Sequence, residues 1–146
     1  MSAARFLNED DRLRVRMAVE EAEKMTSGEI RVYMEDECPP DYLGRAAFIF
    51  DKLGMSQTDL RNGVLIYIAV KDKVLAIIGD EGIHKKVGDN FWEEIKAQMI
   101  KKFAAGMYAE GIVEAVTAAG RALSSYFPYN GDDKNELPDD ITFGEQ

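Results

Sequence analysis

The chain has 146 residues, of which 46% are hydrophobic and 31% charged, so its composition is that of one globular domain with a proper core. Its 27 acidic and 18 basic residues give a net charge of -9, which argues against a nucleic-acid partner and favours cations over anions as ligands. The single cysteine, Cys38, excludes an internal disulfide. No apolar run has the length of a secretory signal or the roughly 20 residues of a membrane span. We therefore expect a soluble, cytoplasmic protein.

The first predicted helix begins after Asn8, whose side chain suits a helix N-cap, and extends to about Met25. Its apolar residues recur at helical spacing: Leu13, Met17, Ala18, Ala22 and Met25. After a break at residues 26–28, the segment 29–35 (EIRVYME) alternates apolar and polar side chains. This alternation is typical of a strand with one face in water.

A second helix is predicted in residues 42–54 (YLGRAAFIFDKLG), followed by residues 64–70 (VLIYIAV), which are apolar almost throughout, as expected of a central strand covered on both faces. Residues 71–73 are short enough for a hairpin turn and lead into a third strand, 74–78. Two amphipathic helices follow, with the apolar stripes Phe91, Trp92, Ile95, Met99, Ile100, Phe103 and Ile112, Val113, Val116, Ala119, Leu123. The segment 128–146 carries six acidic residues and little that could form a core, so we expect a solvated, disordered tail.

The order of these elements predicts the fold class. A strand-helix-strand unit pairs its strands in parallel, and helices before and after it cover both sheet faces. We therefore predict an α/β/α three-layer sandwich, with a small mixed sheet of three to four strands, for a domain of residues 1–127. In this topology the turn 79–82 faces residues 61–63 at one end of the sheet, and an acidic loop follows the first strand at the other end.

Three segments in this order and spacing, TSGEIRVYME, RNGVLIYIAV and IIGDEGIHKKVGDNFWEEI, resemble the TPM domain family of thylakoid-lumen and photosystem-repair proteins. The resemblance covers about Asn8 to Phe127 and is most specific at residues 61–63 and 79–83. It implies an α/β/α sandwich, binding of divalent metals including calcium, and the acid-phosphatase activity attributed to plant members. Many members also carry a signal peptide and a membrane helix or glycine-rich tail, and we expect neither here.

The turn 79–82 is open to three interpretations: a phosphate cradle, a metal site or a plain connection. Its glycine spacing matches neither the dinucleotide fingerprint nor the Walker pattern, and two adjacent acids repel phosphate. A site for Ca²⁺, or for Mg²⁺ or Mn²⁺, needs carboxylate and carbonyl oxygens, which both ends of the sheet offer. The candidate ligands are Asp80, Glu81 and Asn62 at one end and Glu35, Glu37 and Asp41 at the other, and the sequence does not rank the two ends.

Two function classes follow from these residues. The first is a calcium-type metal-binding module that acts through a protein partner. The alternative is a metal-assisted acid phosphatase in which the ion polarises the phosphoryl oxygen and Arg61 neutralises transition-state charge. An enzyme requires a nucleophile or an activated water, and we interpret His84, the single histidine, as a surface residue beside two lysines. The sequence therefore favours the module.

Overall fold

The computed structural model describes residues 3–129 and 141–144. The elements are α1 (Ala3–Phe6), α2 (Glu9–Glu23), β1 (Glu29–Glu35), α3 (Tyr42–Lys52), the 3-10 helix η1 (Met55–Gln57), β2 (Gly63–Ala69), β3 (Val74–Gly79), α4 (Glu81–Val87), α5 (Asp89–Ala104), α6 (Tyr108–Tyr126) and β4 (Thr142–Phe143). The sheet has the order β3-β2-β1-β4, in which β1 is parallel to β2 and β4, and β2 and β3 form an antiparallel hairpin. The predicted parallel pair and hairpin are confirmed.

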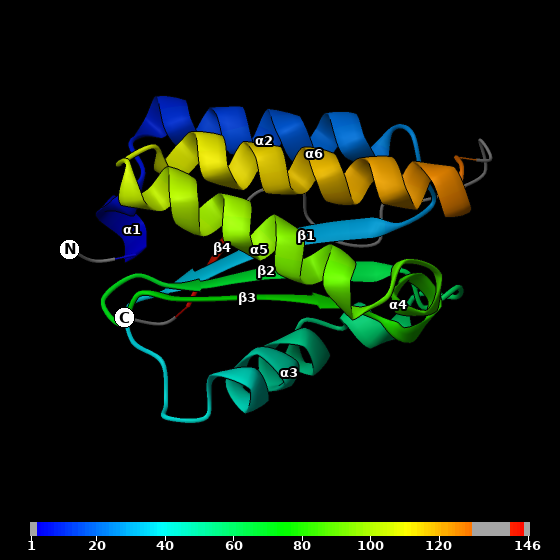
Figure 1. The fold of residues 1–146 in the computed structure, drawn as a ribbon, viewed down its shortest axis with the longest axis horizontal. Coiled ribbons are helices and arrows are strands. Elements are labelled where there is room, and N and C mark those ends of the chain that lie inside the picture. Colours follow the sequence, from blue (N-terminus) through cyan, green and yellow to red (C-terminus); the bar gives the residue numbers. More distant parts are fainter. Residues whose placement is uncertain (1–2, 130–140, 145–146) are drawn as a thin grey trace.

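Helices cover both faces of this sheet, so the chain is a three-layer α/β/α sandwich as predicted (Figure 1). Helices α2, α5 and α6 lie over one face, and α3 lies over the other. Strand β2 is buried along its whole length, which confirms its place as a central strand. Side chains that alternate along β1 and β2 fill the two cores: Ile30, Val32, Met34, Val64, Ile66 and Ile68 on the side of α2 and α6, and Tyr33, Leu65, Tyr67 and Ala69 on the side of α3.

The second face of β1 is not the wet face that its alternating sequence predicts. Tyr33 and Glu35 are only 6% and 5% exposed, because the α3 layer covers them. Glu29 and Glu35 of this strand are therefore buried, and Arg31 is partly buried, so their polar groups need partners inside the protein.

Helix α2 begins as predicted, with the Asn8 side chain accepting a hydrogen bond from the backbone N–H of Asp11 at 2.8 Å. The predicted apolar stripe is only partly buried, with Ala18 and Ala22 packing against the larger core. The buried residues of α2 are Val15 and Val19. Leu13, Met17 and Met25 are 51%, 54% and 62% exposed. Helix α2 packs against α6 and β1 and buries Val15 and Val19.

Hydrogen bonds connect the C-terminal end of α6 to the segment just before β1. The Thr26 hydroxyl donates to the carbonyl oxygen of Phe127, 101 positions later, and the Ser27 N–H donates to the same oxygen at 2.9 Å. An isolated antiparallel bridge joins Thr26 and Pro128. The first and last long helices are thereby joined side by side over the sheet (Figure 1).

Most of the predicted tail, 128–146, lies outside the described residues, but residues 141–144 differ from the prediction. Thr142 and Phe143 form strand β4 beside Tyr33 and Met34 of β1, and Ile141 is buried. An apolar residue at every second position lets this acidic segment supply the fourth strand. Within 3–129 and 141–144, none of the helices combines the length and the apolar character needed to cross a membrane.

Candidate functional site

At one end of the sheet, the loop before β2 meets the end of β3. The Asp80 N–H donates to the carbonyl of Gly63 at 2.9 Å, and the Gly82 N–H donates to the carbonyl of Arg61 at 2.8 Å. The structure thus brings together the two segments that the topology places opposite each other. We call Arg61, Asp80 and Glu81 the Arg61 cluster.

The stretch after β3 is a helix start rather than a plain turn. Asp80 is the N-cap of α4, and its side chain accepts from the Glu81 N–H at 2.8 Å. A Cβ atom added at Gly82 would lie 2.2 Å from the carbonyl oxygen of Leu60, so this glycine permits two backbone segments to touch. The backbone N–H groups of residues 80–82 are all bonded within the protein, which leaves the phosphate-cradle interpretation without support.

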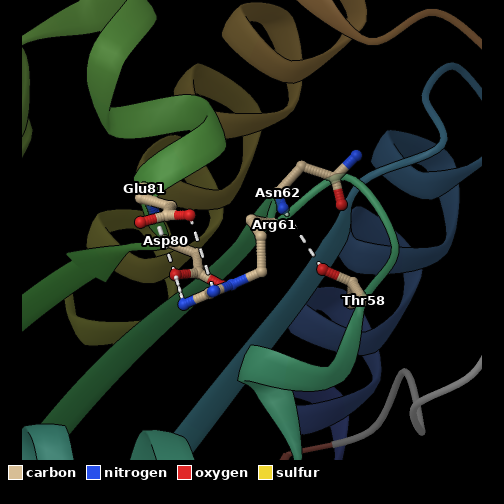
Figure 2. A network of polar contacts seen from close by, with 5 residues as sticks. All are labelled: Thr58, Arg61, Asn62, Asp80 and Glu81. Atoms are coloured by element: carbon tan, nitrogen blue, oxygen red, sulfur yellow. Dashed lines mark hydrogen bonds and ion pairs between the residues drawn. The ribbon is translucent and has the colours of Figure 1, made fainter.

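Asp80 is bound in a bidentate fashion by Arg61 (Figure 2). The Nε and Nη2 atoms of Arg61 lie 2.7 and 2.9 Å from the two carboxylate oxygens of Asp80, whose side chain is only 7% exposed. The Glu81 carboxylate lies 3.5 Å from Nη1 of the same guanidinium, on the solvent side. The hydrogen bond to Asp80 raises the pKa of Arg61. This end of the sheet therefore holds one cation and two carboxylates in direct contact.

Asn62 lies next to this cluster but does not join it. Figure 2 shows its side chain pointing away from the Arg61–Asp80 pair. Its amide donates to the Ser27 hydroxyl at 3.3 Å, and its backbone N–H donates to the Thr58 hydroxyl at 3.2 Å. Asn62 is buried and connects this loop to the segment before β1, so of the three predicted ligands here only Asp80 and Glu81 lie together.

The opposite end of the sheet repeats the same arrangement with a buried glutamate. Arg45 of α3 places Nε and Nη2 2.9 and 2.7 Å from the carboxylate of Glu35, and the Tyr67 hydroxyl donates a short hydrogen bond to the same carboxylate. We call Glu35, Arg45 and Tyr67 the Glu35 cluster.

Electrostatics in the Glu35 cluster favour a charged glutamate. Burial by itself raises the pKa of Glu35, but hydrogen bonds from Arg45 and Tyr67 and the charge of Arg45 outweigh it, so the pKa lies below its ordinary value. The hydrogen bond to Glu35 raises the pKa of Arg45. Burial, followed by hydrogen bonding with Cys38 and Glu35, raises the pKa of Tyr67, which keeps its hydroxyl protonated as a donor.

The other two predicted ligands at this end do not converge on Glu35. Glu37 is exposed, and Asp41 is the N-cap of α3, where its side chain accepts from the Gly44 N–H at 3.0 Å. Asp41 therefore helps to start the helix that carries Arg45, instead of facing a shared ligand.

These residues, as arranged, do not fit a bound calcium ion. In the part of the chain that the structure describes, no group of three or more His, Cys, Asp or Glu side chains is placed to hold a metal. Calcium takes roughly six to eight oxygen ligands, whereas the carboxylates of Asp80 and Glu35 are already bonded to guanidinium groups. Calcium binding therefore stays a prediction.

His84 of α4 is held by two partners. Its Nδ1 accepts from the Nε1–H of Trp92 at 3.0 Å, and its Nε2 lies 3.1 Å from the carboxylate of Asp89. Both ring nitrogens are thus occupied, although the side chain is half-exposed. A general base needs one nitrogen within reach of a substrate proton, so this arrangement suits a structural role for His84.

Arg45 and Tyr67 were missed by sequence reasoning. Tyr67 carries the one polar side-chain group in the run 64–70, and this is the only local signal that its strand contacts something polar. Arg45 lies ten positions from Glu35 on a separate helix, and no local pattern connects them.

A second feature of the molecule is an open groove of about 630 Å³ between α2 and α6, which we call the α2–α6 groove. It is lined by Arg14, Met17, Ala18, Glu21, Ala22, Met25, Val113, Thr117, Gly120, Arg121 and Ser124. On each helix these positions are three or four residues apart, so each helix contributes one continuous stripe. The exposed Met17 of α2 and Met25, which follows the end of α2, belong to this groove.

Together the fold and its two ends define a class of protein: a small α/β/α sandwich with an arginine-bound carboxylate at each end of a central parallel strand pair. The TPM domain model matches residues 1–122, and the chain belongs to the TPM domain family. The chain is similar to a solved structure described as the NMR structure of BA42 protein from the psychrophilic bacteria Bizionia argentinensis sp. nov.. The two are 42% identical with a TM-score of 0.87, over 95% of this chain and 96% of that chain. No curated protein matches the sequence.

Proposed function

We propose that the chain is a protein-interaction module of the TPM family that binds an amphipathic helix of a partner in the α2–α6 groove. The observation that carries this proposal is the groove itself, with Met17 and Met25 more than half exposed along its wall. Exposed apolar side chains gathered in one hollow are typical of interaction sites.

The α2–α6 groove is lined by both small and long apolar side chains, which suits the binding of a helix. Small side chains line it where the two helices approach each other closely, and a Cβ atom at Gly120 would lie 2.7 Å from the Cβ of Ala22. The walls carry methionines, whose unbranched side chains adapt to different apolar partners. A row of apolar side chains at helical spacing fits such a hollow.

The charges on the rim select the kind of helix. Arg14, which forms an ion pair with Asp11, and Arg121 line the groove with one glutamate, Glu21, so the rim is slightly basic on a chain of net charge -9. Acidic residues flanking the apolar face of the partner helix complement this rim and speed association. A second copy of this acidic chain is disfavoured by its own net charge.

A pair of peptides tests this proposal. One is an amphipathic helix of leucine and alanine flanked by glutamates, and the other has lysines at the flanking positions. In heteronuclear NMR titrations, the acidic peptide should shift the amide signals of Ala18, Ala22 and Thr117 and bind several-fold more tightly than the basic one. Met17→Asp should abolish the shifts, whereas Ile100→Asp, a change at a 50% exposed residue outside the groove, should leave them intact. Absence of groove shifts with both peptides, or equal loss in the two variants, would refute the proposal.

The metal-assisted acid phosphatase is the alternative function. It requires the Arg61 cluster to open around an ion and a phosphoryl group, because Asp80 is bonded to Arg61. Turnover of p-nitrophenyl phosphate with added calcium, magnesium or manganese, lost in Asp80→Asn, would favour the phosphatase. Binding of the acidic peptide without turnover would favour the module.

A further inference from the structure

The outer edge of β1 is occupied by the chain's own C-terminal segment, residues 141–144. Strand β1 pairs with β2 along all of 29–35, and on its other side, within residues 3–129 and 141–144, it pairs with β4 at Tyr33–Thr142 and Met34–Phe143. The Gly144 N–H adds a bond of 2.8 Å to the carbonyl of Met34. Among the described residues this backbone pairing is short, and it resembles complexes in which a peptide adds one strand to a sheet.

Side-chain contacts make this short pairing selective. Ile141 is 6% exposed and belongs to the larger core, and Phe143 packs against the same core with the guanidinium of Arg12 4.7 Å from its ring centre. Thr142 points to the other face of the sheet, where its hydroxyl accepts from Nε of Arg31 at 2.8 Å. Successive residues thus contact opposite faces of the sheet.

The fourth residue, Gly144, is restricted in size by its neighbours. A Cβ atom added at Gly144 would lie 2.7 Å from the hydroxyl of Tyr33 and 2.8 Å from the Cβ of Glu35, so no larger residue fits without movement. Each of the four positions therefore contacts a different group of the protein. In order, the positions carry an apolar residue, a hydroxyl-bearing residue, an aromatic residue and glycine. This segment also lies beyond residues 1–122, the part that matches the TPM domain model.

We propose that the outer edge of β1, with Arg31 and Arg12, is a docking groove for an extended partner segment of the pattern apolar–Thr–aromatic–Gly, and that residues 141–144 occupy it as an intramolecular competitor. The partner segment runs parallel to β1 and replaces β4. This groove lies at the sheet edge and is independent of the α2–α6 groove, so either proposal can fail without the other.

Competition between the two segments sets the expected affinities. A tethered segment acts at an effective concentration of about millimolar, so the intact chain binds a free peptide only weakly. Weakening the resident segment, with the rest of the chain unchanged, exposes the groove. The probe is a fluorescein-labelled peptide with the sequence of residues 139–146, DDITFGEQ.

Fluorescence polarisation with the full chain provides the test. Ile141→Asp should bind the peptide at least about tenfold more tightly than the unchanged protein, because its own segment competes poorly. The same peptide with aspartate in place of isoleucine should not bind. Adding Arg31→Ala to Ile141→Asp should weaken binding about fivefold, since the bond to the threonine is lost. Ile100→Asp, a change at an exposed residue outside the α2–α6 groove, should have no effect.

Two variants keep this test decisive. If Ile141→Asp loses the native circular dichroism spectrum, Gly144→Val displaces the same segment through its contact with Tyr33 and replaces it in the assay. A folded variant that does not bind the peptide at millimolar concentration overturns the proposal, as does equal binding by the variant and the unchanged protein. Loss of the fold in both variants also overturns it, because the segment is then an integral part of the core.

Discussion

Replacing Arg45 of the Glu35 cluster should destabilise the protein, because the buried charge of Glu35 then has no cation beside it. In Arg45→Met the carboxylate of Glu35, whose side chain is 7% exposed, keeps the Tyr67 hydroxyl as a donor but loses its cation. Breaking a buried pair on one side costs about 3 to 5 kcal/mol. We expect about 3 kcal/mol, at the low end, because Tyr67 remains and the Arg45 side chain is partly exposed. For a chain of this length this lowers the melting temperature by roughly 6 to 12 °C.

The pH dependence distinguishes a charge effect from a packing effect. The lowered pKa of Glu35 means that its ion pair stabilises the folded protein above the ordinary glutamate pKa of about 4.3 and is lost as the pH falls through the folded value. Without Arg45, burial raises the pKa of Glu35, so acid neutralises a charge that has no cation. The stability difference between Arg45→Met and the unchanged protein should therefore fall to about half or less between pH 7 and pH 4.

Urea unfolding followed by circular dichroism at both pH values measures these differences. Arg16→Met, which removes an exposed ion pair with Glu20, is the matched control and should cost at most about 1 kcal/mol. The double variant Glu35→Gln/Arg45→Met should be more stable than Arg45→Met, because no uncompensated charge remains. Equal deficits at pH 7 and pH 4, or a double variant less stable than the single one, would refute the reasoning.

Two further predictions concern the other end of the sheet. If a cation binds at Asp80, it must compete with Arg61, so millimolar calcium should raise the melting temperature of Arg61→Met more than that of the unchanged protein at fixed ionic strength; no rise in either protein would contradict the calcium prediction. Gly82→Ala should destabilise the chain by about 1 to 3 kcal/mol in urea unfolding, because its Cβ would meet the Leu60 carbonyl at 2.2 Å, and a neutral result would show that α4 can move away from this loop.

The sequence predicts the sheet well because strand topology is encoded in local patterns. The apolar run 64–70, the short turn after it and the helix before it together define a parallel pair and a hairpin, and these place Arg61 opposite Asp80. What the sequence could not reveal is how each carboxylate is used. Asp80 and Glu35 look like free metal ligands in the sequence, and only the folded chain shows that each is bound by an arginine.

The short elements α4 and β4 were not predicted from the sequence, for a related reason. Helix α4 has seven residues, too few for a helical periodicity to emerge between Gly79 and Gly88. Strand β4 has two residues and follows a run of acidic residues, so its pairing depends on contacts with β1 more than 100 positions away. The apolar stripe that begins in α2 is divided between two roles, because Ala18 and Ala22 pack against the core whereas Met17 and Met25 line a surface groove.

The joining of α2 to α6 has a consequence for how the protein matures. The two walls of the α2–α6 groove come from the first and last long helices, and the Thr26–Phe127 hydrogen bond closes them across 101 positions. During synthesis α2 emerges early, yet its partner is complete only when residue 126 has left the ribosome. The groove therefore exists only on the finished chain, and a partner that binds it discriminates fully folded molecules from nascent or truncated ones.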